Sequence, residues 1–322
     1  MHVFLTGATG LIGSRVAALL AGRGDTLACL VRESSNTGPL EAAGADLIIA
    51  DLADPVALAR GLERADAAIH IAALYDIGVV DSTEMERVNV GGTGAFLDAV
   101  AQARTPVAVY VSSTAALGPA TNGEGDPDRE WQGPYPSVYH RTKADAHRLA
   151  RAAAKAGTPV TIVSPAFGYG PGDTGPAGRF VNDIVRGRVP GLLMRPSWYS
   201  YVHVDDIAAG IVAALDHGAA AAHFVLGGEV ATVNDFAIRV ARLAGRRPPP
   251  LRMPTWLALG TGILLDTVTR TTGASFTISR ESIAVSAGLR WVHAYDATVS
   301  TLGWNPRSLD EGLPSVVEYF LD

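Results

Sequence analysis

A short apolar strand that runs straight into a glycine-rich turn and then a helix constrains this chain more than any other feature. The strand covers residues 2–6, and the helical pattern continues to Leu20. Glycines at such a turn let backbone amides and the helix N-terminus approach a pyrophosphate. A turn that is glycine-rich only because the chain holds 35 glycines is the alternative. We expect these residues to bind a dinucleotide: Gly7, Thr9, Gly10, Leu11, Ile12 and Gly13.

Further strands are predicted after this unit, each separated from the next by a helical segment. They cover residues 26–31, 46–50, 67–71, 107–111 and 158–164. Strands that alternate with helices in this way form a parallel, doubly wound α/β sheet, and its ligands bind beyond the carboxyl ends of the strands. The predicted fold class is therefore α/β with a dinucleotide site at that edge.

The residue after the second predicted strand bears on which dinucleotide fits. NAD-specific sites usually place an acidic residue there to bind the ribose hydroxyls, whereas this chain has Arg32, with Ser34 and Ser35 just beyond. A planar guanidinium suits the 2′-phosphate of NADP. We expect NADP(H) in preference to NAD(H), with a solvated arginine as the alternative.

Two more strand ends offer cofactor contacts. Asp51 and Leu52 follow the third strand, where a carboxylate can accept a hydrogen bond from the adenine amino group. Ala72 and Ala73 follow the fourth, and their small side chains leave room for a cofactor against the backbone. All four are predicted cofactor-binding residues.

Tyr139 and Lys143 lie four residues apart on a segment predicted to be helical from Ser137. Residues at i and i+4 share one helix face. A nearby cation favours the ionised form of a phenol, so this pair suits proton transfer. Only Lys143 and Lys155 are lysines among the 26 basic residues. Since arginine does not release its proton, a lysine here favours a chemical role over an ordinary surface helix.

Taken together, these motifs resemble the extended short-chain dehydrogenase/reductases, the NAD-dependent epimerase/dehydratase superfamily, and in character its dihydroflavonol-reductase-like members. The resemblance covers nearly the whole chain and rests on nine motifs in order. They are Thr6–Gly13, Asp51-Leu52, His70–Ala73, Asn89–Thr93, Ser112-Ser113, Tyr139-x-x-x-Lys143, Pro165–Gly172, Tyr201–Asp206 and Leu302–Pro306.

The resemblance implies a catalytic set of Ser113, Tyr139 and Lys143. Ser113 would hold the substrate carbonyl or hydroxyl. Thr114 would take this role if the family's serine position aligns one residue later in this chain. Tyr139 would transfer the proton. Lys143 would lower the Tyr139 pKa and hydrogen-bond the nicotinamide ribose. Asn89 is treated as structural.

The resemblance also implies two lobes. A Rossmann domain would comprise residues 1–165 and 201–228, and a smaller substrate-binding lobe residues 166–200 and 229–322. Pro165 and Phe167 would contact the cofactor. Family members often dimerise through the helices near Asn89 and Ser137, so a homodimer is expected.

Several reactions occur in this family, so particular residues must select one. Dehydratases carry an Asp-Glu pair directly after the active-site hydroxyl, where this chain has Ala115 and Ala116. Nucleotide-sugar enzymes place an arginine where this chain has Tyr199. These differences favour reduction of a ketone or aldehyde, or oxidation of the alcohol, on a small and rather apolar substrate.

Two other functions stay open. In a nucleotide-sugar epimerase, a cation from Arg179, Arg188 or Arg195 would replace the missing arginine. A non-catalytic NADP-binding sensor would usually lack the Tyr/Lys pair. Several aromatic and apolar residues either line an apolar pocket or pack the small lobe: Trp131, Tyr135, Met194, Trp198 and Tyr199.

Composition limits the partners. A net charge of −6, a pI near 5.7 and the absence of a basic cluster argue against nucleic acid and anionic membranes. The single cysteine, Cys29, is expected in a strand of the core, and no metal site is expected. The first strand begins at once, which favours a cytoplasmic protein. The apolar run 256–265 is too short to span a membrane, and a buried or lid helix is expected there, with a weak membrane-surface contact as the alternative.

Overall fold

The computed structural model describes residues 1–322 apart from 79–80, 219, 273–275 and 277. Its main element is a seven-stranded sheet in which all neighbouring strands are parallel. The strands lie in the order β3 (Asp46–Ile49), β2 (Thr26–Val31), β1 (His2–Thr6), β4 (Ala67–His70), β5 (Val107–Val111), β6 (Val160–Pro165) and β10 (His223–Leu226). The chain starts near the centre and winds to both edges, which confirms the predicted α/β fold class.

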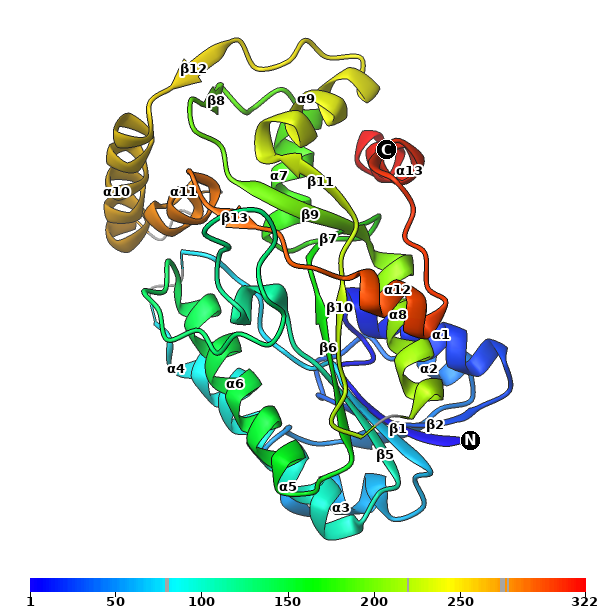
Figure 1. The fold of residues 1–322 in the computed structure, drawn as a ribbon. Coiled ribbons are helices and arrows are strands. Elements are labelled where there is room, and N and C mark those ends of the chain that lie inside the picture. Colours follow the sequence, from blue (N-terminus) through cyan, green and yellow to red (C-terminus); the bar gives the residue numbers. More distant parts are fainter. Residues whose placement is uncertain (79–80, 219, 273–275, 277) are drawn as a thin grey trace.

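Helices cover both faces of this sheet (Figure 1). One face carries α1 (Leu11–Gly22), α2 (Gly38–Ala42), α8 (Val204–His217) and α12 (Asp296–Leu302), and the other α3 (Pro55–Leu62), α5 (Thr93–Ala103) and α6 (Val138–Lys155). Alternate strand residues enter the two cores: Leu5 lies in the first and Phe4 in the second. Cys29 is fully buried in the first core, as predicted.

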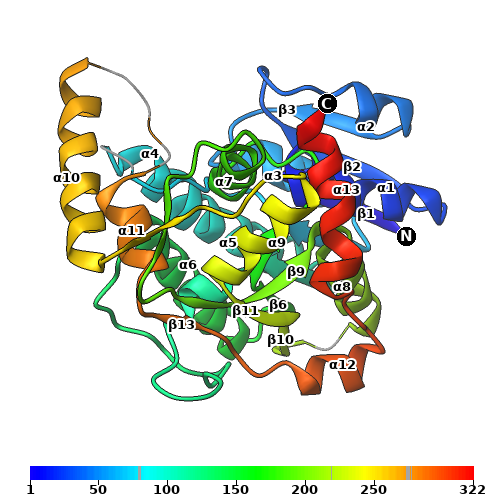
Figure 2. The same cartoon turned by 90° about the horizontal axis from the view of Figure 1, so that it is seen from above.

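A second, smaller lobe lies beyond the carboxyl ends of the main strands (Figure 1). Its sheet contains β7 (Phe167–Tyr169), β9 (Trp198–His203), β11 (Glu229–Thr232) and β13 (Arg290–Trp291), and β8 (Gly191–Leu193) pairs separately with β12 (Leu251–Met253). A third apolar core joins this sheet to α7 (Pro176–Val185), α9 (Val233–Leu243) and α13 (Leu309–Leu321). Two further helices, α10 (Thr255–Thr272) and α11 (Arg280–Ser286), stand at the edge of the molecule (Figure 2).

Two segments cross the divisions expected between the lobes. β9 pairs with β7, β11 and β13, so a boundary at residue 201 falls inside this strand. Although α12 and Trp304 belong to the range 229–322, they pack in the first core, where Trp304 Nε1 donates to the Asp206 carbonyl at 2.8 Å. The C-terminal segment therefore connects the two lobes.

Helix starts follow capping chemistry. Asp54 caps α3 and Ser137 caps α6, each by accepting backbone N–H groups. The cap of α8 is His203, whose Nδ1 accepts from the Asp205 amide at 3.3 Å. Asp205 and Asp206 lie in the first turn of α8, where negative charge complements the helix dipole.

Three other expectations need adjustment. The helix expected to open at Asn89 begins earlier, with α4 (Thr83–Glu86) and a π-helical stretch, Arg87–Gly92, before α5. The apolar run 256–265 does form a helix, yet it is not buried, since Trp256 is 72% exposed. Strand β6 begins at Val160, two residues later than expected.

Candidate active site

A cavity of about 1070 Å³ lies between the lobes, where the strands of the main sheet end. Every residue predicted for cofactor binding or catalysis lines it, so the structure brings the whole predicted set together. The set comprises Gly7, Thr9, Gly10, Leu11, Ile12, Gly13, Arg32, Asp51, Leu52, Ala72, Ala73, Ser113, Tyr139, Lys143, Pro165 and Phe167. The individual roles of these residues remain predictions.

The glycine turn forms a cradle that side chains would fill. Gly7 has a φ of +77°, and a Cβ there would lie 2.5 Å from the Ala72 nitrogen. At Gly13 a Cβ would lie 2.0 Å from the Gly7 carbonyl oxygen. Gly10 precedes α1 and provides no side-chain cap, so the amides of the first turn are open to a ligand. These features fit the pyrophosphate of a dinucleotide.

Two arginines lie beside the ends of β2 and β3. Arg87 Nη1 donates to Asp51 Oδ1 at 2.7 Å, and Glu84 binds the same guanidinium at 2.7 Å. The hydrogen bond from Arg87 lowers the pKa of Asp51. Arg32 is exposed and makes no ion pair with any residue that the structure describes. Arg32 is thus the cation available to bind a 2′-phosphate. Arg87 was not predicted from the sequence, where the only indication of a site role is its position two residues before Asn89.

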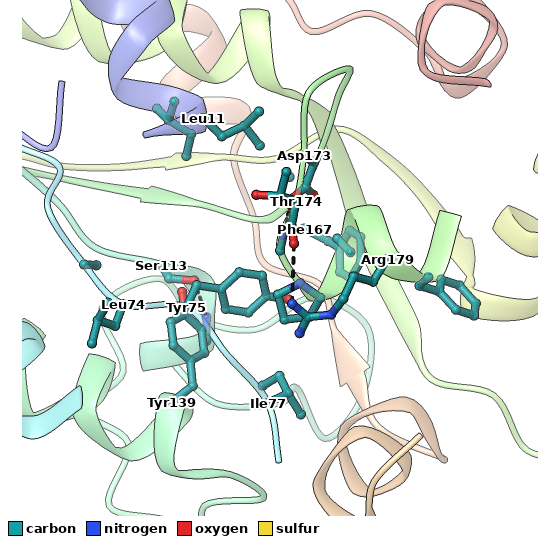
Figure 3. A pocket seen from close by; sticks show the side chains of 18 of the residues that line it. Leu11, Leu74, Tyr75, Ile77, Ser113, Tyr139, Phe167, Asp173, Thr174 and Arg179 are labelled. Carbon is teal, nitrogen blue, oxygen red and sulfur yellow. Dashed lines mark hydrogen bonds between the residues drawn. The ribbon is translucent and has the colours of Figure 1, made fainter. Parts of the chain in front are cut away.

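Ser113, Tyr139 and Lys143 meet where β5 ends beside α6. Ser113 caps the short 3₁₀ helix η2 (Thr114–Ala116). Its side chain lies beside that of Tyr139 (Figure 3) and hydrogen-bonds it. One turn further along α6, Lys143 is buried and its Nζ donates to the Val111 carbonyl at 3.1 Å. A hydroxyl, a phenol and an amine thus border the same cavity.

Burial dominates the proton affinities of this pair. It raises the pKa of Tyr139 to about 12, an effect that the hydrogen bond from Ser113 only partly offsets, and it lowers the pKa of Lys143 to about 8. In both cases the charged form loses solvation. The expectation that Lys143 lowers the Tyr139 pKa is therefore corrected. Tyr139 is neutral near pH 7 and suited to donate a proton.

Neighbouring polar groups determine which serine meets Tyr139 and hold the backbone beside the site. Ser112 is buried and bonds His147 Nδ1 at 2.8 Å, which leaves Ser113 as the serine that meets Tyr139. Asn89 accepts from the Leu74 amide at 2.7 Å and donates to the Leu74 carbonyl at 3.0 Å. These bonds agree with a structural role for Asn89.

The opposite side of the cavity comes from both lobes (Figure 3). Tyr75 and Ile77 lie in the loop after β4, and Arg179 lies on α7 of the second lobe. Arg179 Nη2 donates to Asp76 Oδ1 at 2.7 Å and so links α7 to that loop. Asp173 accepts from the Gly175 amide at 2.7 Å, and burial raises its pKa.

Most of the five aromatic and apolar residues expected around the substrate do not line the cavity. Trp131 is buried in the third core, where Tyr135 packs on it, and Met194 and Trp198 are 61% and 42% exposed. Of the five, only Tyr199 borders the cavity within the described part of the chain. The aromatic lining includes instead Tyr75, Phe167, Phe180 and Trp291.

Comparison with known proteins identifies similar chains. The model of the NAD dependent epimerase/dehydratase family matches residues 3–227. "Sterol demethylase protein B" of Methylococcus capsulatus is 30% identical over 84% of this chain and 83% of its own length. "Putative dihydroflavonol 4-reductase" of Synechocystis is 28% identical over 98% and 94%. The crystal structure of gox2253 superposes with a TM-score of 0.84 at 29% identity, over 99% of this chain and 97% of that one.

Proposed function

This chain belongs to the NAD-dependent epimerase/dehydratase family of NAD(P)-dependent oxidoreductases, and we propose that it reduces a ketone or aldehyde with NADPH, or oxidises the corresponding alcohol with NADP. The substrate is small and rather apolar. Ser113 holds the substrate oxygen and Tyr139 exchanges a proton with it. When bound, the nicotinamide supplies or accepts the hydride.

The observation that carries the proposal is the contact between Ser113 and Tyr139 above the buried Lys143. A phenol whose pKa is raised to about 12 holds its proton at neutral pH, and the alkoxide that forms during carbonyl reduction must receive one. Lys143, with a pKa lowered to about 8, can exchange protons close to neutrality. The arrangement therefore supports the reducing direction.

Four further observations support the choice of substrate and cofactor. Ala115 borders the cavity where a dehydratase would carry an acid, and the aromatic lining suits an apolar ligand. The names of two relatives refer to a sterol and to dihydroflavonol reduction. The guanidinium of Arg32, which forms no ion pair with the residues that the structure describes, supports NADP(H) over NAD(H). The proposed cofactor-binding residues are the predicted residues that line the cavity, apart from Ser113.

We also propose a cofactor lobe formed mainly by residues 1–165 and 201–228 and a substrate lobe formed mainly by residues 166–200 and 229–322, with β9, α12 and Trp304 connecting the two. A cytoplasmic homodimer that pairs through α5 and α6 is part of the same proposal. Sedimentation equilibrium of the purified protein tests the dimer, and a monomer mass at micromolar concentration would refute it.

Tyr139→Phe tests the proposed activity. We expect NADPH oxidation with a ketone substrate to fall about a hundred- to ten-thousand-fold, while the dissociation constant for NADPH stays within about twofold. Tyr135→Phe is the matched control, because Tyr135 donates to the Trp131 carbonyl outside the cavity. In a non-catalytic NADP-binding sensor, Tyr139→Phe would leave function unchanged. An epimerase, for which Arg179 and Arg188 border the cavity, would recycle its cofactor without net NADPH consumption.

A further inference from the structure

The helix α10 lies at the edge of the molecule (Figures 1 and 2), and it exposes a row of large apolar side chains. Trp256 is 72% exposed, Leu264 64%, Ile263 52% and Leu257 45%. The opposite side of the helix is held against α11, where a Cβ on Gly262 would lie 2.7 Å from the Arg280 nitrogen. The helix is thus fixed by its inner side, and its apolar outer side has no partner within the described chain.

Two more exposed apolar residues lie on or beside the strand pair β8 and β12, which leads into α10. Met194, directly after β8, is 61% exposed, and Leu251 on β12 is 58% exposed. The two segments are joined, since the Met194 amide donates to the Met253 carbonyl at 3.0 Å. We call these residues the apolar corner: Met194, Leu251, Trp256, Leu257, Ile263 and Leu264.

The sequence around the apolar corner is locally basic although the chain is acidic overall. Residues 184–204 contain three arginines and residues 236–265 contain five, and neither stretch contains an aspartate or glutamate. Arg195, Arg247 and Arg252 are neighbours of the corner in sequence and form no ion pair with the residues that the structure describes. The net charge of −6 argues against binding of the chain as a whole to an anionic surface. The two stretches around the apolar corner are nevertheless basic, and their exposed arginines, Arg195, Arg247 and Arg252, complement such a surface locally.

The same elements form part of the cavity wall. Met253 of β12 and Ala258 and Thr261 of α10 line the cavity. No helix within the described residues is long and apolar enough to cross a bilayer. A tryptophan and leucines on one helix side with arginines nearby are typical of a helix that lies in the lipid headgroup region.

We propose that the apolar corner docks on the surface of an anionic lipid bilayer, with α10 in the plane of the interface and the mouth of the cavity turned toward the lipid. Docking itself needs only the surface features described. That the bilayer also delivers a lipid-soluble carbonyl substrate rests on the proposed function.

Flotation with vesicles tests the docking. The intact chain is expected to float with vesicles of equal parts phosphatidylcholine and phosphatidylglycerol, to float less in high salt, and to remain largely unbound with phosphatidylcholine alone. The paired change Trp256→Gln and Leu264→Gln should abolish flotation. The paired change Arg247→Gln and Arg252→Gln should weaken it roughly twenty- to thirty-fold, because each arginine near an anionic surface contributes about 1 kcal/mol.

Matched controls lie on the far face of the cofactor lobe. Val56→Gln removes a 75%-exposed apolar side chain from α3, and the pair Arg60→Gln and Arg64→Gln removes two exposed charges from the same region. Both should float like the parent chain. Tyr139→Phe should do so as well, so a failure of the docking and a failure of the proposed catalysis give separate results.

Three outcomes would overturn the proposal. The parent chain could stay unbound with the anionic vesicles, or it could bind equally well after both sets of changes at the corner. Alternatively, sedimentation could show a dimer that Trp256→Gln and Leu264→Gln convert to a monomer, which would assign the corner to a second copy of the chain. Unchanged thermal unfolding of each variant establishes that a loss of flotation is not a loss of folding.

Discussion

The ring of Tyr75 packs on the ring of Tyr139, with 4.7 Å between the centroids and 57° between the planes. Tyr75 comes from the loop after β4, and Asn89 holds that loop through two hydrogen bonds to Leu74. The phenol proposed to transfer the proton is therefore covered by a second phenol that also borders the cavity. Tyr75 is in a position to contact substrate and to limit the solvation of Tyr139.

Tyr75→Ala should change both binding and proton affinity. Loss of the ring removes an aromatic contact of about 0.5–1.5 kcal/mol and admits water to Tyr139, whose pKa is raised mainly by burial. We expect a KM several-fold higher and an alkaline limb of kcat/KM that moves to lower pH. Tyr75→Phe should keep both values. Tyr319→Ala, at an exposed position on α13, is the control, and an unshifted pH profile for Tyr75→Ala would argue against the covering role.

Arg32→Gln should reduce the preference for NADP(H). A charge-assisted hydrogen bond to a phosphate contributes about 1.5–3 kcal/mol, so the ratio of the NADPH and NADH dissociation constants should shift about ten- to a hundredfold toward NADH. Fluorescence titration with each cofactor measures this ratio. Arg60→Gln removes the same charge from α3 outside the cavity and should leave the ratio unchanged. Equal losses of affinity for both cofactors would show that Arg32 does not contact the 2′-phosphate.

Gly13→Ala should prevent cofactor binding with either dinucleotide. The new Cβ would lie 2.0 Å from the Gly7 carbonyl oxygen, so the turn must move away from the conformation that forms the cradle. NADPH titration should show at least a tenfold weaker complex, and urea unfolding should show a less stable protein. Gly22→Ala, in open space on the same helix, should instead stabilise the chain by about 0.5–1 kcal/mol. Parent-like NADPH affinity in Gly13→Ala would contradict the cradle.

Much of the fold could be predicted because local sequence signals coincide with the sheet topology. The bounds 2–6, 26–31 and 107–111 agree with β1, β2 and β5, since each strand is apolar and ends at a glycine or polar residue. All predicted site residues reach one cavity because the carboxyl ends of parallel strands meet at one edge of the sheet.

The parts that could not be predicted depend on tertiary contacts between distant segments. Arg87 reaches Asp51 across 36 residues, and Arg179 reaches Asp76 from the other lobe. No local pattern marks either pair. The pKa of Tyr139 depends on tertiary contacts in the same way, because burial, to which the ring of Tyr75 contributes, raises it even though Lys143 lies on the same helix face.

Lys143→Met should stabilise the protein in a pH-dependent way. Burial lowers the Lys143 pKa from 10.5 to about 8, so below about pH 8 the lysine is charged in both states and the folded state bears the full desolvation penalty. Between about pH 8 and 10.5 the folded chain releases this proton before the unfolded chain does. The unfolded state then binds more protons, and the stability of the parent rises with pH.

The lowering of the Lys143 pKa to about 8 corresponds to a folded-state penalty of about 3 kcal/mol that methionine removes. Loss of the hydrogen bond to the Val111 carbonyl offsets about 1 kcal/mol of that gain. We therefore expect the free energy of unfolding, measured in urea at about pH 7, to be about 2 kcal/mol higher for Lys143→Met than for the parent chain. This difference should shrink toward zero by about pH 10. The variant should also lose turnover. Lys155→Met is the control, since Lys155 is 71% exposed and its replacement should change stability by less than about 0.5 kcal/mol at either pH. An advantage of equal size at both pH values would mean that methionine packing, and not relief of a buried charge, stabilises the variant.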